Sequence, residues 1–224
     1  MLRSAMSMIE LVFAIVIMGI AVMTLPLVLT QVQNNNAFAM QQEAILAAKA
    51  KMGDLLTYEW DENSYVLGDS HSYVLDVTNG DAELNATAGT PRRVGHIDTD
   101  YRRKFFSVPR LASVIGADGG DLDDVDDFNG TATIIALTVV TEGAGTLDYV
   151  FNNLTLTTTV AYAADSADYS VTPLAFTLNP DDNQTMTNIK TIEVAVSGAP
   201  STVRLHAFTC NIGESKLLPS RPYR

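Results

Sequence analysis

The sequence of 224 residues is poor in the side chains that build most catalytic and metal centres. It has one cysteine, Cys210, which excludes an internal disulfide and any metal site made of several cysteines. Its three histidines, at positions 71, 96 and 206, are scattered and show no recognisable spacing from serine, cysteine or acidic residues. No phosphate-binding glycine loop is present. We therefore predict that the protein is not an enzyme.

Positive charge is also scarce. Lys and Arg total 14 against 26 Asp and Glu, which gives a net charge of −12. A chain with this balance is a poor general binder of nucleic acid, because binding to phosphates depends on cations. Hydrophobic residues make up 47% of the chain, so a folded protein is expected.

The main feature that is present is a long apolar run near the N-terminus. From Met8 to Thr30 the single ionisable side chain is Glu10. These 23 residues would span roughly 34 Å as a helix, enough to cross a hydrocarbon core of about 30 Å. The run continues directly into a polar helical pattern, so we interpret it as a retained membrane helix and not as a cleaved signal. Arg3, the one charge before it, favours a cytoplasmic N-terminus.

Glu10 is anomalous in such a helix. A carboxylate costs about 2.5–3.5 kcal/mol at the bilayer centre and less toward the interface. One interpretation is that Glu10 lies at headgroup depth and is tolerated there. The interpretation we favour is that it pairs with a positive group, such as the amino terminus of a neighbouring subunit.

The N-terminal segment resembles that of type IV pilins and pseudopilins. The resemblance rests on Ser7-Met8-Ile9-Glu10-Leu11, the apolar run after it, Gly19 and Pro26. It covers about 25 residues and implies a membrane helix that packs against the helices of other subunits. Gly19 and Pro26 lie near the positions where helices of that family are softened.

The resemblance also implies a processing site. A prepilin peptidase would cut a short leader between Ala5 and Met6, the new amino terminus at Met6 would be methylated, and Glu10 would become the fifth mature residue. The sequence departs from the family pattern at two positions of this processing site. Ala5 replaces the usual glycine before the cut, which predicts slower processing, and Met6 replaces the usual phenylalanine.

The chain as a whole predicts an α+β fold in which a long helix packs on an antiparallel sheet. We divide it into a leader (1–5), a membrane and assembly helix (6–30), an amphipathic continuation of that helix (31–58) and a periplasmic, β-rich head (59–224). The helix is expected from Met6 to Tyr58, loosened at Gly19, Pro26 and the run 34–36.

Strands are expected where β-branched and aromatic residues alternate with polar ones. The expected strands are Tyr65–Leu67, Tyr73–Val77, Thr131–Val140, Asn153–Tyr162, Asn188–Val196 and Thr202–Asn211. Gly198-Ala199-Pro200 reads as a hairpin connection between the last two, and Asn79-Gly80 as a turn.

The segment 116–130 is unusually acidic. Its aspartates are Asp118, Asp121, Asp123, Asp124, Asp126 and Asp127. Oxygen-rich loops with glycine suit Ca²⁺, which takes six to eight oxygen ligands, although the spacing does not match an EF-hand. We favour a solvated acidic loop without a cofactor and keep a calcium site at these six residues as the alternative.

The head carries a second, weaker resemblance. The string Asp-Asp-Val-Asp-Asp-Phe-Asn-Gly at 123–130, with the segments 188–194 and 203–205, is similar to minor pilins of the mannose-sensitive haemagglutinin pilus, the D type in particular. It covers about half of the head and implies a low-abundance subunit that helps to start or cap a pilus.

A basic cluster precedes the acidic segment. It consists of Arg92, Arg93, Arg102, Arg103, Lys104 and Arg110, interleaved with Tyr101, Phe105 and Phe106. Basic and aromatic side chains together can bind single-stranded nucleic acid. In so acidic a chain we favour pairing with the Asp118–Asp127 loop or with a neighbouring subunit, so a nucleic-acid partner is not expected.

These patterns predict a type IV pilin-like subunit, minor because the chain is longer than is common for major pilins. It would reside in the bacterial inner membrane with a periplasmic head and then in a pilus or pseudopilus. Its expected partners are other pilin subunits through their N-terminal helices, prepilin peptidase and the inner-membrane assembly platform. The alternatives are a pseudopilin of a type II secretion system and a non-polymerising, single-span membrane-anchored binding protein.

Overall fold

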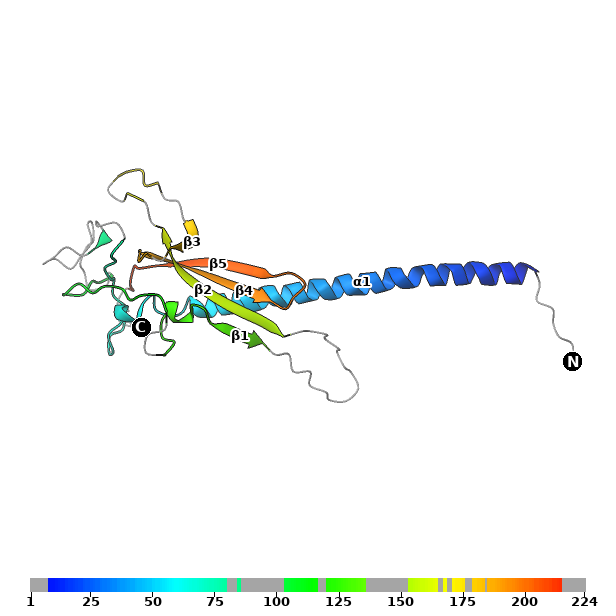
Figure 1. Cartoon of the computed structure of the whole chain (residues 1–224), viewed down its shortest axis with the longest axis horizontal. Helices are drawn as coiled ribbons and strands as arrows, with labels where there is room; N and C mark the ends of the chain where they lie inside the picture. The colour runs from blue at the N-terminus through cyan, green and yellow to red at the C-terminus, as the bar shows by residue number, and fades with distance from the viewer. Residues whose placement is uncertain are drawn as a thin grey trace, which may run out of the picture.

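One long helix dominates the shape of the molecule. The computed structural model describes residues 8–79, 84–85, 103–116, 120–135, 153–164, 167–168, 171–175, 179–183 and 185–214. Helix α1 (Met8–Leu55) has 48 residues, which corresponds to a length of about 72 Å. Its C-terminal part lies along a sheet and its N-terminal part projects away from it (Figure 1).

Helix α1 is continuous through Gly19, Pro26 and the asparagines at 34–36, so the expected loosening there is not seen in its hydrogen-bonded pattern. It ends at Leu55, three residues earlier than predicted. Beyond that point the chain tightens, because the N–H groups of Thr57 and Tyr58 donate to the carbonyls three residues back, at Asp54 and Leu55.

The strands form one antiparallel sheet. They are β1 (Ala132–Ile135), β2 (Leu154–Ala164), β3 (Asn179–Asn183), β4 (Ile189–Ser197) and β5 (Val203–Cys210). Their order is β1-β2-β4-β5, and β3 pairs with the end of β2. The predicted α+β class is confirmed, with α1 packed on β4, β5 and β2.

Two of the predicted strands are wrong. Residues 65–67 lie in coil and a turn after the short 3-10 helix η1 (Glu62–Ser64), and in 73–77 there are only isolated bridges, at Val74 and Asp76. Both segments are rich in β-branched and aromatic residues, but 65–67 has no strand partner among the described residues, and 73–77 meets its neighbours only at single bridges to Phe105 and Leu111. Strand β3, rich in Asn and Asp, was not predicted. Residues 136–140 and Gly80 lie outside the described residues.

The predicted hairpin between β4 and β5 is present. Gly198 has a φ of 100°, which favours glycine. A β-carbon at this position would also clash with the carbonyl oxygen of Asn153. Both constraints explain why the turn that leaves β4 beside β2 has glycine at this position.

The main core lies between α1 and one face of the sheet. Helix α1 contributes four side chains spaced by three or four residues, Ala44, Ala48, Met52 and Leu55, which form one stripe. The sheet contributes alternate residues of its central strands, Leu154, Leu156 and Val160 from β2 and Ile192, Val194 and Val196 from β4. Burial of each larger side chain stabilises the fold by about 1.5–3 kcal/mol.

A second, smaller core continues past the end of α1. It contains Trp60, Leu75, Val77, Ala112 and Tyr162. Leu75, Val77 and Ala112, which lie between η1 and the sheet in sequence, therefore pack beside Trp60 and Tyr162 beyond the end of the helix.

Candidate functional site

The apolar half of α1 is the largest exposed apolar surface among the described residues. None of its side chains before Ala44 is buried, and residues such as Met8, Leu25 and Leu27 are more than half exposed. By length and composition this helix could cross a membrane. Its apolar surface needs a cover of lipid or of other helices, since water disfavours so much contiguous apolar area.

The predicted assembly residues lie on this exposed half. Glu10 is exposed in the first turn of α1, where the helix dipole favours a negative charge. A β-carbon added to Gly19 would meet nothing within 4 Å. Pro26 lies inside the helix, and Thr30 donates its hydroxyl to the Pro26 carbonyl over 2.9 Å. The predicted processing residues Ala5 and Met6 lie outside the described residues.

The acidic segment divides into two environments. Asp118 lies outside the described residues, and Asp121 and Asp123 are exposed. Asp124, Asp126 and Asp127 are almost fully buried. The expectation of a solvated loop is therefore wrong for these three, whose carboxyl groups instead organise the chain around the 3-10 helix η3 (Asp126–Phe128).

Backbone N–H groups account for most of the partners of two of these carboxylates. Asp124 Oδ1 accepts from the N–H groups of Asp126 and Asp127 at 2.8 and 3.2 Å, and its Oδ2 accepts from Glu62 at 2.8 Å. Asp127 Oδ2 accepts from the N–H groups of Asp123 and Asp124. Side-chain oxygens that accept from nearby N–H groups fix a turn in this way.

Lys190 is the cation at the centre of this region, and sequence reasoning missed it. Strand β4 turns the alternate residues Ile192, Val194 and Val196 toward α1, and Lys190 continues that row past the helix end. Its side chain is fully buried and lies opposite Tyr162 in the register between β2 and β4. A lysine in phase with the buried positions of a strand was the one available signal.

The ammonium group of Lys190 is surrounded by acceptors. It donates to the carbonyl of Trp60 over 2.6 Å and to Asp61 Oδ2 over 3.4 Å, and it contacts Asp126 Oδ1. It also lies 4.3 Å from the centre of the Trp60 ring, within the range of a cation–π contact. Asp61 was not predicted as a site residue either.

Asp61 and Asp126 are the acidic partners of this lysine. Asp61 is held by the N–H of Asn63 at 3.0 Å and by the N–H and hydroxyl of Ser113 at 2.8 and 3.1 Å. Asp126 Oδ2 accepts from the N–H of Gly116 over 3.3 Å. Both partners are thus held by backbone N–H groups of the segment 113–116.

Burial dominates the electrostatics of this cluster. It raises the pKa of Asp126 to about 7, against the lowering effect of Lys190, and the adjacent Asp124 carboxyl raises it further by charge repulsion and hydrogen bonding. Burial also raises the pKa of Asp124. The pKa of Tyr162 is raised by burial and by the nearby carboxylates.

The arrangement bears on the calcium prediction, which stays a prediction. Carboxylate oxygens of Asp61, Asp124 and Asp126 lie within 4.8 Å of one another. However, these oxygens already accept from Lys190 and from backbone N–H groups, whereas Ca²⁺ needs six to eight free oxygen ligands. The buried part of the segment is therefore a poor fit to calcium, because a lysine provides the positive charge.

The basic cluster is only partly described, since Arg92, Arg93, Tyr101 and Arg102 lie outside the described residues. Arg103 is exposed, and Arg110 stacks over the ring of Phe106 at 4.2 Å. Phe106 in turn stacks on Tyr73. Within the described part of the chain, the cation that pairs with the buried Asp61 and Asp126 is Lys190, which is not a member of the predicted cluster.

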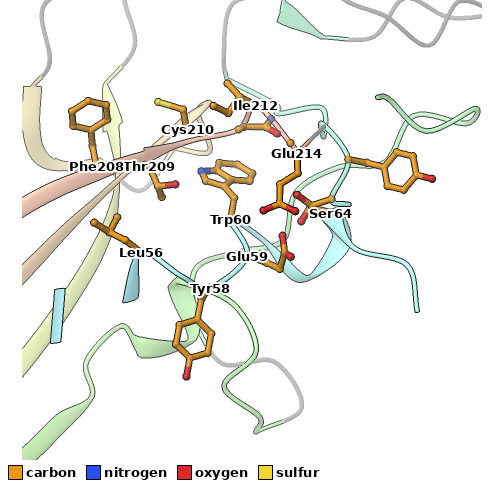
Figure 2. A pocket seen from close by; sticks show the side chains of 14 residues that line it. Leu56, Tyr58, Glu59, Trp60, Ser64, Phe208, Thr209, Cys210, Ile212 and Glu214 are labelled. Atoms are coloured by element: carbon orange, nitrogen blue, oxygen red, sulfur yellow. The ribbon is translucent and has the colours of Figure 1, made fainter. Parts of the chain in front are cut away.

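A pocket of about 360 Å³ is lined by Trp60 and by residues from the end of α1 and the end of β5. Figure 2 shows Glu59, Ser64 and Glu214 gathered near Trp60. Burial raises the pKa of Glu59, with a smaller contribution from the charge of Glu214. The pocket joins polar groups to an aromatic wall, a composition that suits a small polar molecule or water.

Comparison with protein-family models, with curated protein sequences and with solved structures found no match to this chain. The structure itself is compatible with a pilin-like protein anchored in a membrane. It has one long apolar N-terminal helix and an antiparallel sheet packed on the second half of that helix.

Proposed function

We propose that this chain is a type IV pilin-like minor subunit, which is inserted in the bacterial inner membrane and then assembles into or primes a pilus. The observation that carries the proposal is the two-part nature of α1. Its apolar half is exposed and its second half, without a break, packs on the sheet. Because the same helix is both the anchor and the core helix of the head, the lipid or subunits that cover its apolar half also fix the position of the head.

In the membrane, lipid covers the apolar half. In a fibre, the same half packs against the equivalent helices of neighbouring subunits, so the surface that anchors the subunit also assembles it. Removal of the leader after Ala5 exposes a cationic amine at Met6. Glu10 of an adjacent helix neutralises this amine, because either charge alone is costly in a low-dielectric bundle.

Gly19 and Pro26 have a place in the same proposal. Gly19 leaves open space on the helix surface, which lets a neighbouring helix approach closely, and Pro26 removes one backbone hydrogen bond. The helix can then adjust between the membrane and the fibre. Prepilin peptidase and the inner-membrane assembly platform are the partners that this route requires.

The first test is a pair of matched substitutions on α1. We expect Glu10→Leu to stay in the membrane fraction but to be lost from sheared fibres, measured by immunoblot of both fractions. Glu43→Leu is the control, since Glu43 is an exposed glutamate on the same helix outside the apolar run. Normal incorporation of the Glu10 variant would refute the assembly role.

The second test is the mass of the N-terminal peptide. A peptide that begins at a methylated Met6 supports the pilin class, whereas an intact leader and no co-sedimentation with filaments favour the non-polymerising anchor. We expect Ala5→Gly to be processed faster, because it restores the usual residue before the cut. The remaining alternative is a pseudopilin of a type II secretion system. Immunogold labelling of sheared pili tests it, because label on the pili supports a pilus subunit and its absence favours the pseudopilin.

A further inference from the structure

Lys190 and Asp126 meet in the interior of the head from elements that are 64 residues apart in the sequence. The side chain of Lys190 is 0% exposed and that of Asp126 is 1% exposed. We propose that these two side chains condense spontaneously to an amide, an isopeptide cross-link between Lys190 Nζ and Asp126 Cγ that joins β4 to η3. The inference does not depend on the proposed function.

The reacting atoms are held together by the fold. Lys190 Nζ is fixed by the carbonyl of Trp60, by Asp61 and by the face of the Trp60 ring, so that it rests against the carboxyl group of Asp126. Asp126 is fixed in turn because its backbone N–H donates to Asp124 and its Oδ2 accepts from Gly116. Two reactants that are held in contact without solvent react far faster than the same groups free in water.

The protonation of the cluster suits the reaction. An amine attacks a carboxylic acid in its neutral form, and burial with a neighbouring carboxylate favours the neutral form of Asp126. Transfer of a proton within the contact converts the ion pair to a neutral amine and a neutral acid. Asp124, which is hydrogen-bonded to Asp126, is the group that can hold and return a proton during the reaction.

The step balances without any other reagent. The lone pair of Lys190 Nζ forms a bond to Cγ of Asp126, and the bond from Cγ to the hydroxyl oxygen breaks. The ammonium group loses two protons in total. The first has already passed to the Asp126 carboxylate and made it a neutral acid, and the second leaves the nitrogen with the hydroxyl group as water. Nothing is oxidised or reduced, and the ion pair becomes an amide plus one water molecule.

Burial favours the product as well as the reaction. The cross-link replaces two charges, which are costly to desolvate, with one neutral amide. The water that is released leaves the core, and a dry site protects the amide from hydrolysis. Asp61 is the less suitable partner for the amine, because its oxygens are engaged by Asn63 and Ser113 and its contact with Nζ is longer.

The cross-link would supply what the composition lacks. With Cys210 as the single cysteine, the head cannot form an internal disulfide. An amide between η3 and β4 would close a loop of the chain and pin the segment that follows α1, because Trp60 packs on the same lysine.

Peptide mapping of the wild-type full chain, purified in detergent, is the decisive measurement. No Lys or Arg lies between Arg110 and Lys190, so trypsin leaves both partners in one peptide and, if Lys190 is acylated, does not cut after it. A second protease that cuts after aromatic residues, such as Phe128 and Tyr149, separates the partners. We expect a branched peptide whose mass is lower by one water and whose fragments place the link on Lys190 and Asp126.

Fragment spectra are needed because Asp118-Gly119 can also lose water as a succinimide. A linear peptide with an unmodified Lys190 would overturn the proposal and leave a buried salt bridge, and a link to Asp61 would overturn the assignment of the partner.

Variants then test the roles of the residues. We expect Lys190→Arg, which keeps the positive charge, and Asp126→Ala to lack the branched peptide altogether. Asp124→Asn retains both partners of the bond and should lower the cross-linked fraction at least tenfold shortly after synthesis. An Asp124→Asn chain that cross-links as fast as wild type would contradict the part assigned to Asp124, while Arg204→Met, an exposed basic residue on β5, should leave the cross-link intact.

Discussion

The two ends of α1 present opposite problems of solvation. Around its N-terminal half the side chains are apolar and exposed, whereas just beyond Leu55 the charged side chains of Lys190 and Asp61 are fully buried. The first region has no partner among the described residues that would cover it. The second is surrounded by hydrogen-bonding groups from four separate segments of the chain.

This difference in solvation indicates a different role for each region. An exposed apolar helix is stable only when something outside the chain covers it, so its residues suit contact with lipid or with other subunits. A buried charge is stable only with partners inside the chain, so its residues serve the fold itself. Perturbation of one region should therefore leave the function of the other intact.

Loss of the buried cation should have the largest effect. Lys190→Met leaves Asp61 and Asp126 buried without their positive partner, and we expect unfolding to become easier by about 3–5 kcal/mol. In a chain that carries the proposed amide, the substitution removes the cross-link in place of the ion pair, and the expected direction is the same. Trp60, the single tryptophan, lies in the head and reports its unfolding by fluorescence in urea.

The matched control is Arg204→Met on the neighbouring strand. Arg204 pairs with Glu193, but its side chain is 59% exposed. An exposed pair contributes about 0–1 kcal/mol, so little change is expected. Equal effects of the two substitutions would mean that burial of Lys190 does not matter.

The next prediction applies one substitution to both halves of α1. Leu55 is 0% exposed and packs in the main core, whereas Leu29 is 63% exposed. We expect Leu55→Ala to destabilise the head by about 3 kcal/mol, through lost burial and the cavity left behind. Leu29→Ala should leave the urea midpoint of Trp60 fluorescence unchanged, and a shift there would show that the outer half supports the head.

The same contrast explains how far the sequence could predict the structure. Helix α1 and strands β2, β4 and β5 followed from local periodicity, because their apolar positions repeat at the spacing of a helix or a strand. The pairing of Lys190 with Asp61 and Asp126 did not follow, since it joins segments 129 and 64 residues apart. Net charge and a run of aspartates suggested solvent or calcium, and only the fold shows that a lysine from β4 enters the cluster.

A charge placed in the outer half should weaken its attachment to the membrane. Ile17 lies near the middle of the apolar run and is 65% exposed. Ile17→Lys should cost about 2.5 kcal/mol of insertion free energy and raise the fraction extracted by alkaline carbonate. The remaining apolar residues still favour insertion, so a partial loss is expected.

Phe38→Lys is the control for that experiment, because Phe38 is similarly exposed but lies beyond the apolar run. It should extract like wild type. Neither variant should change the urea midpoint of the head, and a head that unfolds more easily in the Ile17 variant would break the separation between the two regions.

The smallest predicted effect concerns the pocket beside Trp60. Burial raises the pKa of Glu59 above its ordinary value, so the folded state binds more protons than the unfolded state as pH rises through that window. The stability that Glu59 contributes is therefore full below its unfolded pKa, falls as pH rises and is lost above the folded pKa. Because Glu59 is only half-buried, solvent screening limits this effect to less than about 1 kcal/mol.

Glu59→Gln tests this effect, because it keeps a partner for the Ser72 hydroxyl but removes the titration. The variant should gain stability relative to wild type at about pH 8 and not at about pH 4, measured by urea midpoints. Glu43→Gln, an exposed change on α1, should show no such pH dependence, and a Glu59 variant that tracks wild type at every pH would place the titrating group elsewhere.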